Sequence, residues 1–380
     1  MTAVQDNEPP EARRQALAGA RILARLENAG ARTVMTPILQ PAAPFLELSG
    51  EELAKRVYLT TDPAGRELCL RPEFTIPLSR HYLAEETPGA RAMYAYHGTV
   101  FRHRGGVGEF PQAGVELFGE EDDEEADASL LALALECSGL AAPQLHLGDA
   151  RLFDTFLTAI GFPPAVEAHL RRRFSRAGDL AAEIEAMASS SAPASPLAAL
   201  LARSDDATAR AAVDEMLQLT GLGEGASIAG RSSADIAARY IERAVVGSGA
   251  ALDAEKAALM IRYLRVDASP WEALDALEAI AVAGRLRMNG ALDDFARRLG
   301  LMADEGVELY DSARFSTAFG RRIDYYSGLV FEIHDADRPG IGPVVGGGRY
   351  DGLLRRLGAA EDVPAVGFSV WVERLPEQAS

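Results

Sequence analysis

Apolar and polar residues alternate most clearly near the end of the chain, between Leu329 and Glu332. Leu329 and Phe331 share one face and Val330 and Glu332 the other, a period of two that predicts a β-strand. The stretch 320–332 also carries polar groups that could not all be buried without partners: Arg321, Arg322, Asp324, Tyr325, Tyr326 and Glu332. We therefore expect this stretch to form the floor of a pocket.

A second predicted strand, at Val344 and Val345, runs directly into Gly346, Gly347 and Gly348. Glycines at the end of a strand indicate that the backbone turns sharply or comes close to another group. An ordinary glycine-rich turn would have the same pattern. Its position soon after the polar stretch favours a role in the same pocket.

The N-terminal part of the chain has a helical pattern followed by a broken strand. Residues 11–28 place apolar side chains on one stripe and predict a helix. Residues 34–39 are apolar enough for a strand, but Pro37 cannot donate a hydrogen bond to a neighbouring strand. This strand is therefore expected at an edge or at an interface.

A hairpin and a carboxylate come next. Residues 57–60 and 66–71 flank an Asp-Pro-Ala-Gly turn sequence, which predicts an antiparallel hairpin. Glu73 follows the second strand, where its carboxylate could face a pocket or lie in a solvated loop. Thr75 is expected to cap the helix that follows.

Two apolar runs between 92 and 119 predict a long antiparallel hairpin with a basic tip at 102–109. Gln112 and Glu116 are four residues apart on its second strand, so they point to the same face. That face could converge on a pocket or lie in solvent, and the strand pattern alone does not separate these alternatives.

The remaining segments add helices and complete the sheet. The acidic run 120–127 is interpreted as a solvated cap of a helix over 128–138. Residues 161–265 are alanine-rich and contain no cluster of candidate site residues, so they are expected to form an inserted helical subdomain. The Ser-Pro-Trp-Glu sequence at 269–272 predicts a helix start with a capping box. Further strands are predicted at 144–147 and within 364–375.

These elements predict an α+β fold. About seven strands are expected, most of them joined as antiparallel hairpins, with helices at the margins of the sheet rather than between parallel strands. The expected organisation is one domain formed by residues 1–160 and 266–380, interrupted by the helical insertion at 161–265.

The composition and the net charge exclude several classes of function. The 380 residues carry a net charge of −18 without a dense basic run, so the chain is a poor candidate for nucleic-acid binding. Two cysteines, Cys69 and Cys137, lie in apolar surroundings, and no spacing of histidine and cysteine is typical of a zinc site. No metal, no cofactor and no membrane span is expected. The N-terminus lacks the apolar segment of a signal peptide, so a cytoplasmic location is expected.

Four stretches, in this order, resemble the catalytic domain of histidyl-tRNA synthetase, which has a class II synthetase fold. They are LRPEFTIPLSR (70–80), VFRHRGGVGEFPQAGVELFG (100–119), RRIDYYSG with GGGRYDGL (321–353), and PAVGFSVWVERL (364–375). Residues 34–39 resemble motif 1, which implies that Pro37 lies at a dimer interface. The resemblance covers residues 10–160 and 266–375.

The resemblance implies a histidine-binding site. A carboxylate on one ring nitrogen would orient an imidazole, whose pKa in water is about 6.5. Matching the motifs residue by residue assigns Glu73 and Gln112 to the α-amino group, Glu116 and Tyr326 to the imidazole, Arg321 to the carboxylate, and Tyr325 to the lining.

Departures from the synthetase pattern concern the nucleotide site. Arg102 matches the arginine of motif 2, but Arg104 stands where motif 2 has a glutamate. Trp371 stands where motif 3 has a glycine, and an indole there would fill the space of the adenine. Arg374 is retained, so the nucleotide site is expected to be degraded rather than erased. No anticodon-binding domain is expected.

A chain that combines a histidine pocket with a blocked ATP pocket resembles the regulatory subunits of ATP phosphoribosyltransferase, which are paralogues of the synthetase. This resemblance implies a non-catalytic protein that partners the short-form catalytic subunit and conveys feedback inhibition by L-histidine in the first step of histidine biosynthesis. It also implies a homodimer within a hetero-octamer. Histidine can inhibit only if it binds one state of the complex better than the other.

Two alternatives stay open at this point. The chain could be a truncated histidyl-tRNA synthetase-like enzyme that activates an amino acid, for which Arg102, Arg321 and Arg374 argue. It could also be an interaction protein with a vestigial pocket, against which the complete set of pocket residues argues.

Overall fold

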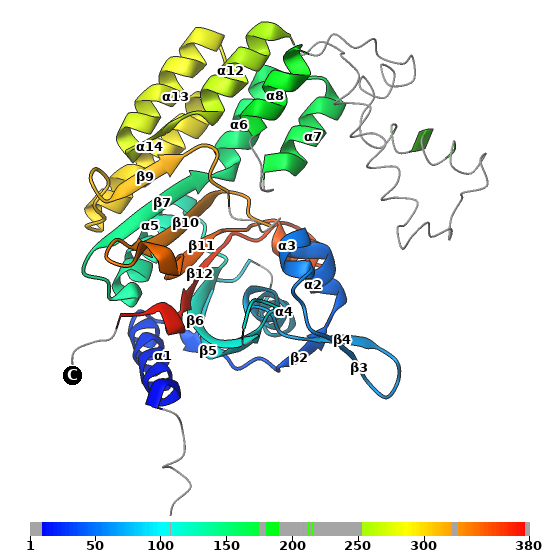
Figure 1. Cartoon of the computed structure of the whole chain (residues 1–380), viewed down its shortest axis with the longest axis vertical. Coiled ribbons are helices and arrows are strands. Elements are labelled where there is room, and N and C mark those ends of the chain that lie inside the picture. Colours follow the sequence, from blue (N-terminus) through cyan, green and yellow to red (C-terminus); the bar gives the residue numbers. More distant parts are fainter. Residues whose placement is uncertain are drawn as a thin grey trace, which may run out of the picture. The chain divides into compact units, whose positions relative to one another are not determined.

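A computed structural model describes residues 10–376 apart from 88, 107, 175–179, 321–324 and most of 190–252 (Figure 1). The chain divides into two compact units. The first unit contains residues 1–151, 267–274 and 292–380, and the second contains residues 152–266 and 275–291. The sheets and all the candidate site residues belong to the first unit.

The helices described in the chain range from one turn to about five turns. They are α1 (Pro10–Asn28), α2 (Ala43–Leu48), α3 (Glu51–Ala54), α4 (Thr75–Glu85), α5 (Asp123–Ser138), α6 (Ala150–Ile160), α7 (Pro164–Phe174), α8 (Leu180–Ser189), α12 (Ala254–Leu264), α13 (Pro270–Gly284), α14 (Asn289–Asp304) and α15 (Leu353–Arg356). Two short 3₁₀ turns are η1 (Pro339–Ile341) and η2 (Val372–Arg374).

The described strands form two sheets. They are β1 (Arg32–Thr33), β2 (Leu39–Pro41), β3 (Leu59–Thr61), β4 (Glu67–Leu70), β5 (Ala92–Phe101), β6 (Glu109–Phe118), β7 (Pro143–Asp149), β8 (Asp267–Ala268), β9 (Ala313–Ser316), β10 (Leu329–Asp335), β11 (Val345–Arg349) and β12 (Ala365–Trp371). The larger sheet has nine strands in the order β1-β5-β6-β12-β11-β10-β7-β9-β8, and β2-β4-β3 form the smaller one. From β5 to β7 every neighbouring pair is antiparallel.

The α+β class expected from the sequence is confirmed, whereas the expected count of about seven strands is too low. The missed strands are mostly short: β1 and β8 have two residues each, too few to produce a periodic pattern. The long hairpin between 92 and 119 is confirmed as β5 and β6. One half of the capping box is confirmed, because the carboxylate of Glu272 accepts from the backbone N–H of Ser269, and the hydroxyl of Ser269 donates to the same carboxylate.

Helices cover the larger sheet within the first unit. α1 packs across β5 and β6, and α5 packs across β10, β11 and β12. Ile22 and Leu26 form the buried side of α1. Gly19 lets this helix approach β5, since a Cβ there would lie 2.1 Å from Nε2 of His97. Of the apolar stripe predicted within 11–28, Ile22 and Leu26 lie on the packing face of α1, whereas Leu23 is half-buried and Leu17 is exposed.

The expected strand at 34–39 is wrong. The backbone is irregular from Val34 to Ile38, and β2 begins only at Leu39. Arg71, which follows β4, makes hydrogen bonds to this irregular segment in place of those between paired strands. Its side chain donates to the carbonyls of Thr36 and Thr99, and its backbone N–H donates to the carbonyl of Ile38. Pro37 itself is exposed.

The interpretation of 120–127 as a solvated cap is confirmed for Asp122, whose side chain accepts from the N–H of Glu125, but it is wrong for Asp127 and for the start of the helix. The helix begins at Asp123, with Asp122 as its N-cap, so most of the acidic run lies inside α5. Asp127 is fully buried between two buried arginines: its carboxylate lies 2.8 Å from Arg349 and 2.9 Å from Arg298. These partners come from distant parts of the chain, so a local pattern could not indicate them.

Candidate functional site

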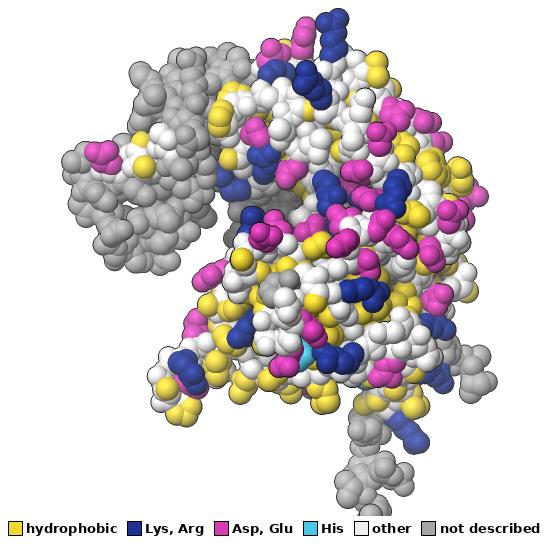
Figure 2. All heavy atoms as spheres, turned by 180° about the vertical axis from the view of Figure 1, so that it is seen from behind, with side chains coloured by type: hydrophobic (Ala, Val, Ile, Leu, Met, Phe, Trp, Pro, Cys, Tyr) yellow, Lys and Arg dark blue, Asp and Glu magenta, His cyan; other side chains and the backbone are white. Residues whose placement is uncertain are grey.

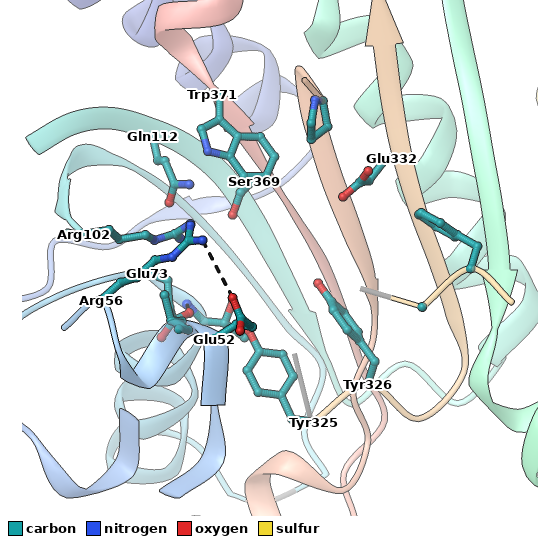
Figure 3. A pocket seen from close by; sticks show the side chains of 15 residues that line it. Glu52, Arg56, Glu73, Arg102, Gln112, Tyr325, Tyr326, Glu332, Ser369 and Trp371 are labelled. Carbon is teal, nitrogen blue, oxygen red and sulfur yellow. Dashed lines mark hydrogen bonds and ion pairs between the residues drawn. The ribbon is translucent and has the colours of Figure 1, made fainter. Parts of the chain in front are cut away.

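A cavity of about 540 Å³ opens over the larger sheet of the first unit (Figure 3). Most of the residues singled out in the sequence meet there. In Figure 3, Gln112 and Trp371 lie at one end and Tyr325 and Tyr326 at the other. The lining consists of Glu52, Leu53, Arg56, Glu73, Thr75, Arg102, Gln112, Phe319, Gly320, Tyr325, Tyr326, Glu332, Pro343, Ser369 and Trp371.

Glu73 lies at the N-terminus of α4 and is buried. Its carboxylate accepts hydrogen bonds from the backbone N–H groups of Thr75 and Ile76, so Glu73, and not Thr75 as expected, supplies the side-chain cap. Burial raises the pKa of Glu73 to about 7, although the N–H group of Ile76 and the nearby Arg102 act in the opposite direction. The solvated-loop alternative for Glu73 is therefore wrong.

Gln112 is fully buried on β6, so the solvent-face alternative for this strand is wrong as well. Neither its amide nitrogen nor its amide oxygen has a hydrogen-bond partner among the described residues. A buried amide without partners is costly in free energy, of the order of 1–3 kcal/mol. Because the side chain lines the cavity, a polar ligand could satisfy both of its atoms.

Glu116 lies four residues further along β6 and is 1% exposed. It does not line the cavity itself. Its carboxylate accepts hydrogen bonds from the hydroxyls of Thr75, at 2.7 Å, and Tyr350. Burial raises the pKa of Glu116 to about 8, although these two hydrogen bonds lower it. Gly367 makes room for the carboxylate, since a Cβ there would lie 1.8 Å from Oε2.

Thr75 and Tyr350 are two of the site residues that the sequence analysis missed, and Glu52, Arg56 and Ser369 of the lining are others. Thr75 lines the cavity and links it to Glu116, while Tyr350 holds Glu116 from the other side. Thr75 had been interpreted as a helix cap. Tyr350 lies in the glycine-rich stretch after β11, and its position between Arg349 and Asp351 in a polar run was the available signal.

Tyr325 and Tyr326 precede β10 in an irregular segment, so the strand predicted over 320–332 begins only at Leu329. Their ring centroids are 5.3 Å apart. The next residue fixes this segment: the hydroxyl of Ser327 accepts from the N–H of Asp351 at 2.9 Å and donates to its carboxylate at 3.2 Å. Arg321 lies outside the described residues.

Protein groups occupy the side of the cavity where the resemblance places a nucleotide. Trp371 is buried, and the guanidinium of Arg374 stacks over its ring at 5.0 Å. Arg374 also donates to the carbonyl of Pro343 at 2.7 Å. Arg104 makes two hydrogen bonds with Glu373, at 2.6 and 2.9 Å. Neither Arg104 nor Arg374 is part of the cavity lining, whereas Arg102 and Trp371 are.

The arrangement suits a small ligand with cationic and hydrogen-bonding groups. Two buried acids, Glu73 and Glu116, and the free amide of Gln112 lie at or just behind the wall, and two tyrosine rings enclose the other end. Within the described residues, no group of three or more His, Cys, Asp or Glu side chains is placed to hold a metal ion. No helix in the described part of the chain is long and apolar enough to span a membrane.

The fold and the cavity define a protein of the class II aminoacyl-tRNA synthetase type. The family model of histidyl-tRNA synthetase matches residues 3–245 and 243–375. A solved structure titled as an ATP phosphoribosyltransferase regulatory subunit/histidyl-tRNA synthetase from Bacillus halodurans is 19% identical, with a TM-score of 0.65 over 98% of this chain and 80% of that one. Histidyl-tRNA synthetase from Nostoc sp. PCC 7120 is 16% identical, with a TM-score of 0.62 over 98% and 75% of the two chains. These two likenesses establish the fold.

Sequence relatives establish the particular family. The ATP phosphoribosyltransferase regulatory subunits of Brucella canis and Brucella suis are each 40% identical over 358 residues, which cover 91% of this chain and 92% of theirs. The chain belongs to the family of ATP phosphoribosyltransferase regulatory subunits. The resemblance derived from the sequence motifs is thereby confirmed.

Proposed function

We propose that this chain is a non-catalytic regulatory subunit that activates the short-form catalytic subunit of ATP phosphoribosyltransferase and conveys feedback inhibition by L-histidine. The reaction would be the first step of histidine biosynthesis. Family membership supports the partnership with a catalytic subunit. The observation that carries the histidine assignment is the buried amide of Gln112, which lacks a partner among the described residues and lies with Glu73 in the cavity wall.

The proposed contacts follow the chemistry of histidine. Glu73 and Gln112 would bind the α-amino group, and the hydroxyl of Tyr326 and the carboxylate of Glu116 would bind the imidazole. Because Glu116 lies behind Thr75, its contact with the ligand requires Thr75 to turn or to relay the hydrogen bond. Arg321 would bind the carboxylate.

The same cavity argues against amino-acid activation. Adenylate formation needs space for the adenine ring and positively charged side chains around the phosphates. Trp371 fills the floor on that side, and Arg104 and Arg374 are engaged by Glu373 and Pro343. If the chain were an activating enzyme instead, it would catalyse histidine-dependent ATP–pyrophosphate exchange. We expect no exchange under conditions where a histidyl-tRNA synthetase is active.

The proposed assembly is a homodimer within a hetero-octamer. The segment around Pro37 would form the dimer interface. Three apolar side chains near it are at least 46% exposed: Met35 at 92%, Ile38 at 46% and Leu39 at 52%. Exposed apolar side chains that lie close together are typical of an interface. We further propose that residues 161–265 are a helical insertion and that the protein acts in the cytoplasm without binding tRNA.

The test is an activity assay with the purified short-form catalytic subunit. We expect the rate of phosphoribosyl transfer to rise when the chain is added, and L-histidine to reduce that rate. A catalytic subunit that is equally active alone would contradict the activating role. Activation without any effect of histidine would contradict the sensing role.

A further inference from the structure

Arg56 lines the cavity from the segment that follows α3, and neither the sequence motifs nor the proposed function uses it. Its backbone is fixed on two sides. The N–H of Arg56 donates to the carbonyl of Leu53 at 2.9 Å, and its carbonyl accepts from the N–H of His103 at 2.8 Å. The ring of Tyr58 packs against that of His103, with the centroids 3.7 Å apart. The tip of the β5–β6 hairpin therefore holds Arg56 at the cavity.

The side chain of Arg56 is held less firmly than its backbone. Its guanidinium lies 3.9 Å from the carboxylate of Glu52, and the two side chains are 52% and 46% exposed. An ion pair this long between exposed groups contributes little to stability, so another carboxylate can replace Glu52 as the partner. Arg102, the other cationic side chain of the described lining, instead donates through Nε to the carbonyl of Pro72 at 2.6 Å.

A ligand carboxylate needs such a cationic partner in this protein. The chain has a net charge of −18, and in Figure 2 acidic side chains are spread widely over the described surface with basic ones among them. The cavity lining itself contains three acids, Glu52, Glu73 and Glu332. A carboxylate that enters a cavity of this charge is repelled unless a cation offsets the field of the acids.

We propose that Arg56 binds the α-carboxylate of the ligand and thereby selects an amino acid over the corresponding amine. The inference rests on the proposed function, which places the α-amino group at Glu73 and Gln112. The carboxylate is attached to the same carbon atom as the amino group, so it must lie close to these two residues. Figure 3 shows Arg56 on their side of the cavity, across from Tyr325 and Tyr326.

The guanidinium group suits this role because its planar fork of N–H donors matches the two oxygens of a carboxylate. Arg56 would act in addition to Arg321. Binding of the ligand would replace the contact between Arg56 and Glu52, which is long and exposed, by a charge-assisted hydrogen bond inside the cavity.

The experiment measures the dissociation constants of L-histidine and of histamine by titration calorimetry with the full chain. Histamine keeps the amino group and the imidazole and lacks only the carboxylate. The test variants are Arg56→Gln, which removes the charge, and Arg56→Lys, which keeps it. The matched control is Arg66→Gln. Arg66 is also an exposed arginine paired with an acid four positions earlier, Asp62, but it lies outside the cavity lining.

We expect Arg56→Gln to bind L-histidine about tenfold more weakly, because one charge-assisted hydrogen bond to a partly exposed group contributes about one power of ten to affinity. Histamine should bind more weakly than histidine to the wild type, and it should bind equally to the wild type and to Arg56→Gln. Arg56→Lys should recover part of the affinity for histidine, and Arg66→Gln should bind both ligands as the wild type does.

Unchanged affinity of Arg56→Gln for histidine would overturn the inference and leave the proposed function intact. An equal loss for histidine and histamine, without recovery in Arg56→Lys, would overturn it too, because Arg56 would then shape the cavity and not bind the carboxylate. The same loss in Arg66→Gln would show an effect of net charge alone and would also overturn it. Absence of histidine binding by the wild type would contradict both proposals.

Discussion

Trp371 and Gln112 are opposite each other in the register of β12 and β6, and both side chains line the same cavity. Trp371 fills space in the wall of the cavity, whereas both polar atoms of the Gln112 amide lack a hydrogen-bond partner among the described residues. In the proposed function, the pair marks the boundary between the side of the cavity that corresponds to a nucleotide site and the side that we assign to histidine. Each residue leads to a prediction that can be tested separately.

Gln112→Leu should separate stability from binding. The substitution removes a buried amide that has no partner in the described structure, so the free energy of unfolding without ligand should stay the same or rise by about 1–3 kcal/mol. Histidine binding should be lost, because the amide would contact its α-amino group. Urea denaturation and calorimetry measure the two quantities.

The matched control for this prediction is Gln40→Leu. Gln40 is also buried, but its amide donates to the carbonyl of Pro37 at 2.8 Å and accepts from Arg80 at 3.3 Å. Removing these bonds should lower the free energy of unfolding by about 1 kcal/mol or more. If Gln112→Leu destabilised the protein as much as Gln40→Leu does, the amide of Gln112 would not be unsatisfied in solution.

Trp371→Gly should open the nucleotide side. Adenine nucleotides should then bind, as measured by the quenching of a fluorescent ATP analogue, while the affinity for histidine stays at the wild-type value. The loss of a buried indole should also lower the free energy of unfolding by about 3–5 kcal/mol. Trp371→Phe keeps a ring in the same space and should not gain nucleotide binding. Nucleotide binding by the unaltered chain would mean that Trp371 is no barrier.

Glu116→Gln should change how stability depends on pH. The pKa of Glu116 is about 8 in the folded chain, against an ordinary value of 4.5. The folded state therefore holds this proton more tightly, and the stabilisation is complete below about pH 4.5 and is lost as the pH rises to about 8. The neutral amide of the variant does not lose a proton in this pH range, so its stability does not fall in this way. We expect the variant to gain stability relative to the wild type progressively between pH 5 and 8.

Urea denaturation across that pH range measures the difference between the two proteins. Glu121→Gln, at an exposed position, serves as the control and should show no such trend. A difference between Glu116→Gln and the wild type that does not vary with pH would mean that Glu116 is ionised throughout the range.

Asp127→Asn should be the most destabilising of the charge-removing changes. It would leave the guanidinium groups of Arg298 and Arg349 buried with less compensation, at a cost of about 3–5 kcal/mol. Asp362→Asn removes the partner of Arg355 from an exposed pair and should cost no more than about 1 kcal/mol. Equal effects in thermal or urea denaturation would show that the buried cluster is not required for stability.

Local patterns in the sequence predicted the parts of the fold that are formed by neighbouring residues. The hairpin of β5 and β6, the helix α1 and the capping box at Ser269 all follow from periodicity or from a short motif. The expectation of a close approach at the glycine-rich stretch was right in kind. At Gly347 a Cβ would lie 2.4 Å from the carbonyl of Gly367, but the strand continues through the glycines and does not end at them.

Contacts between segments far apart in the sequence could not be predicted from such patterns. Asp127 was interpreted as solvated because its partners lie more than 170 positions away, at Arg298 and Arg349. The contact between Thr75 and Glu116 was missed for the same reason. In the candidate site, the motifs indicated several residues that line one cavity, among them Glu73, Gln112 and Tyr326, but also Glu116, which lies behind its wall. The missing partner of Gln112 could only be recognised from the packed structure.

Direct titration of the chain with L-histidine tests the central claim. Isothermal calorimetry should give saturable binding of one histidine per chain, with no detectable binding of leucine, because buried polar groups reject an apolar side chain strongly. No heat of binding at saturating histidine, from a chain that is folded and dimeric, would contradict the assignment of the cavity.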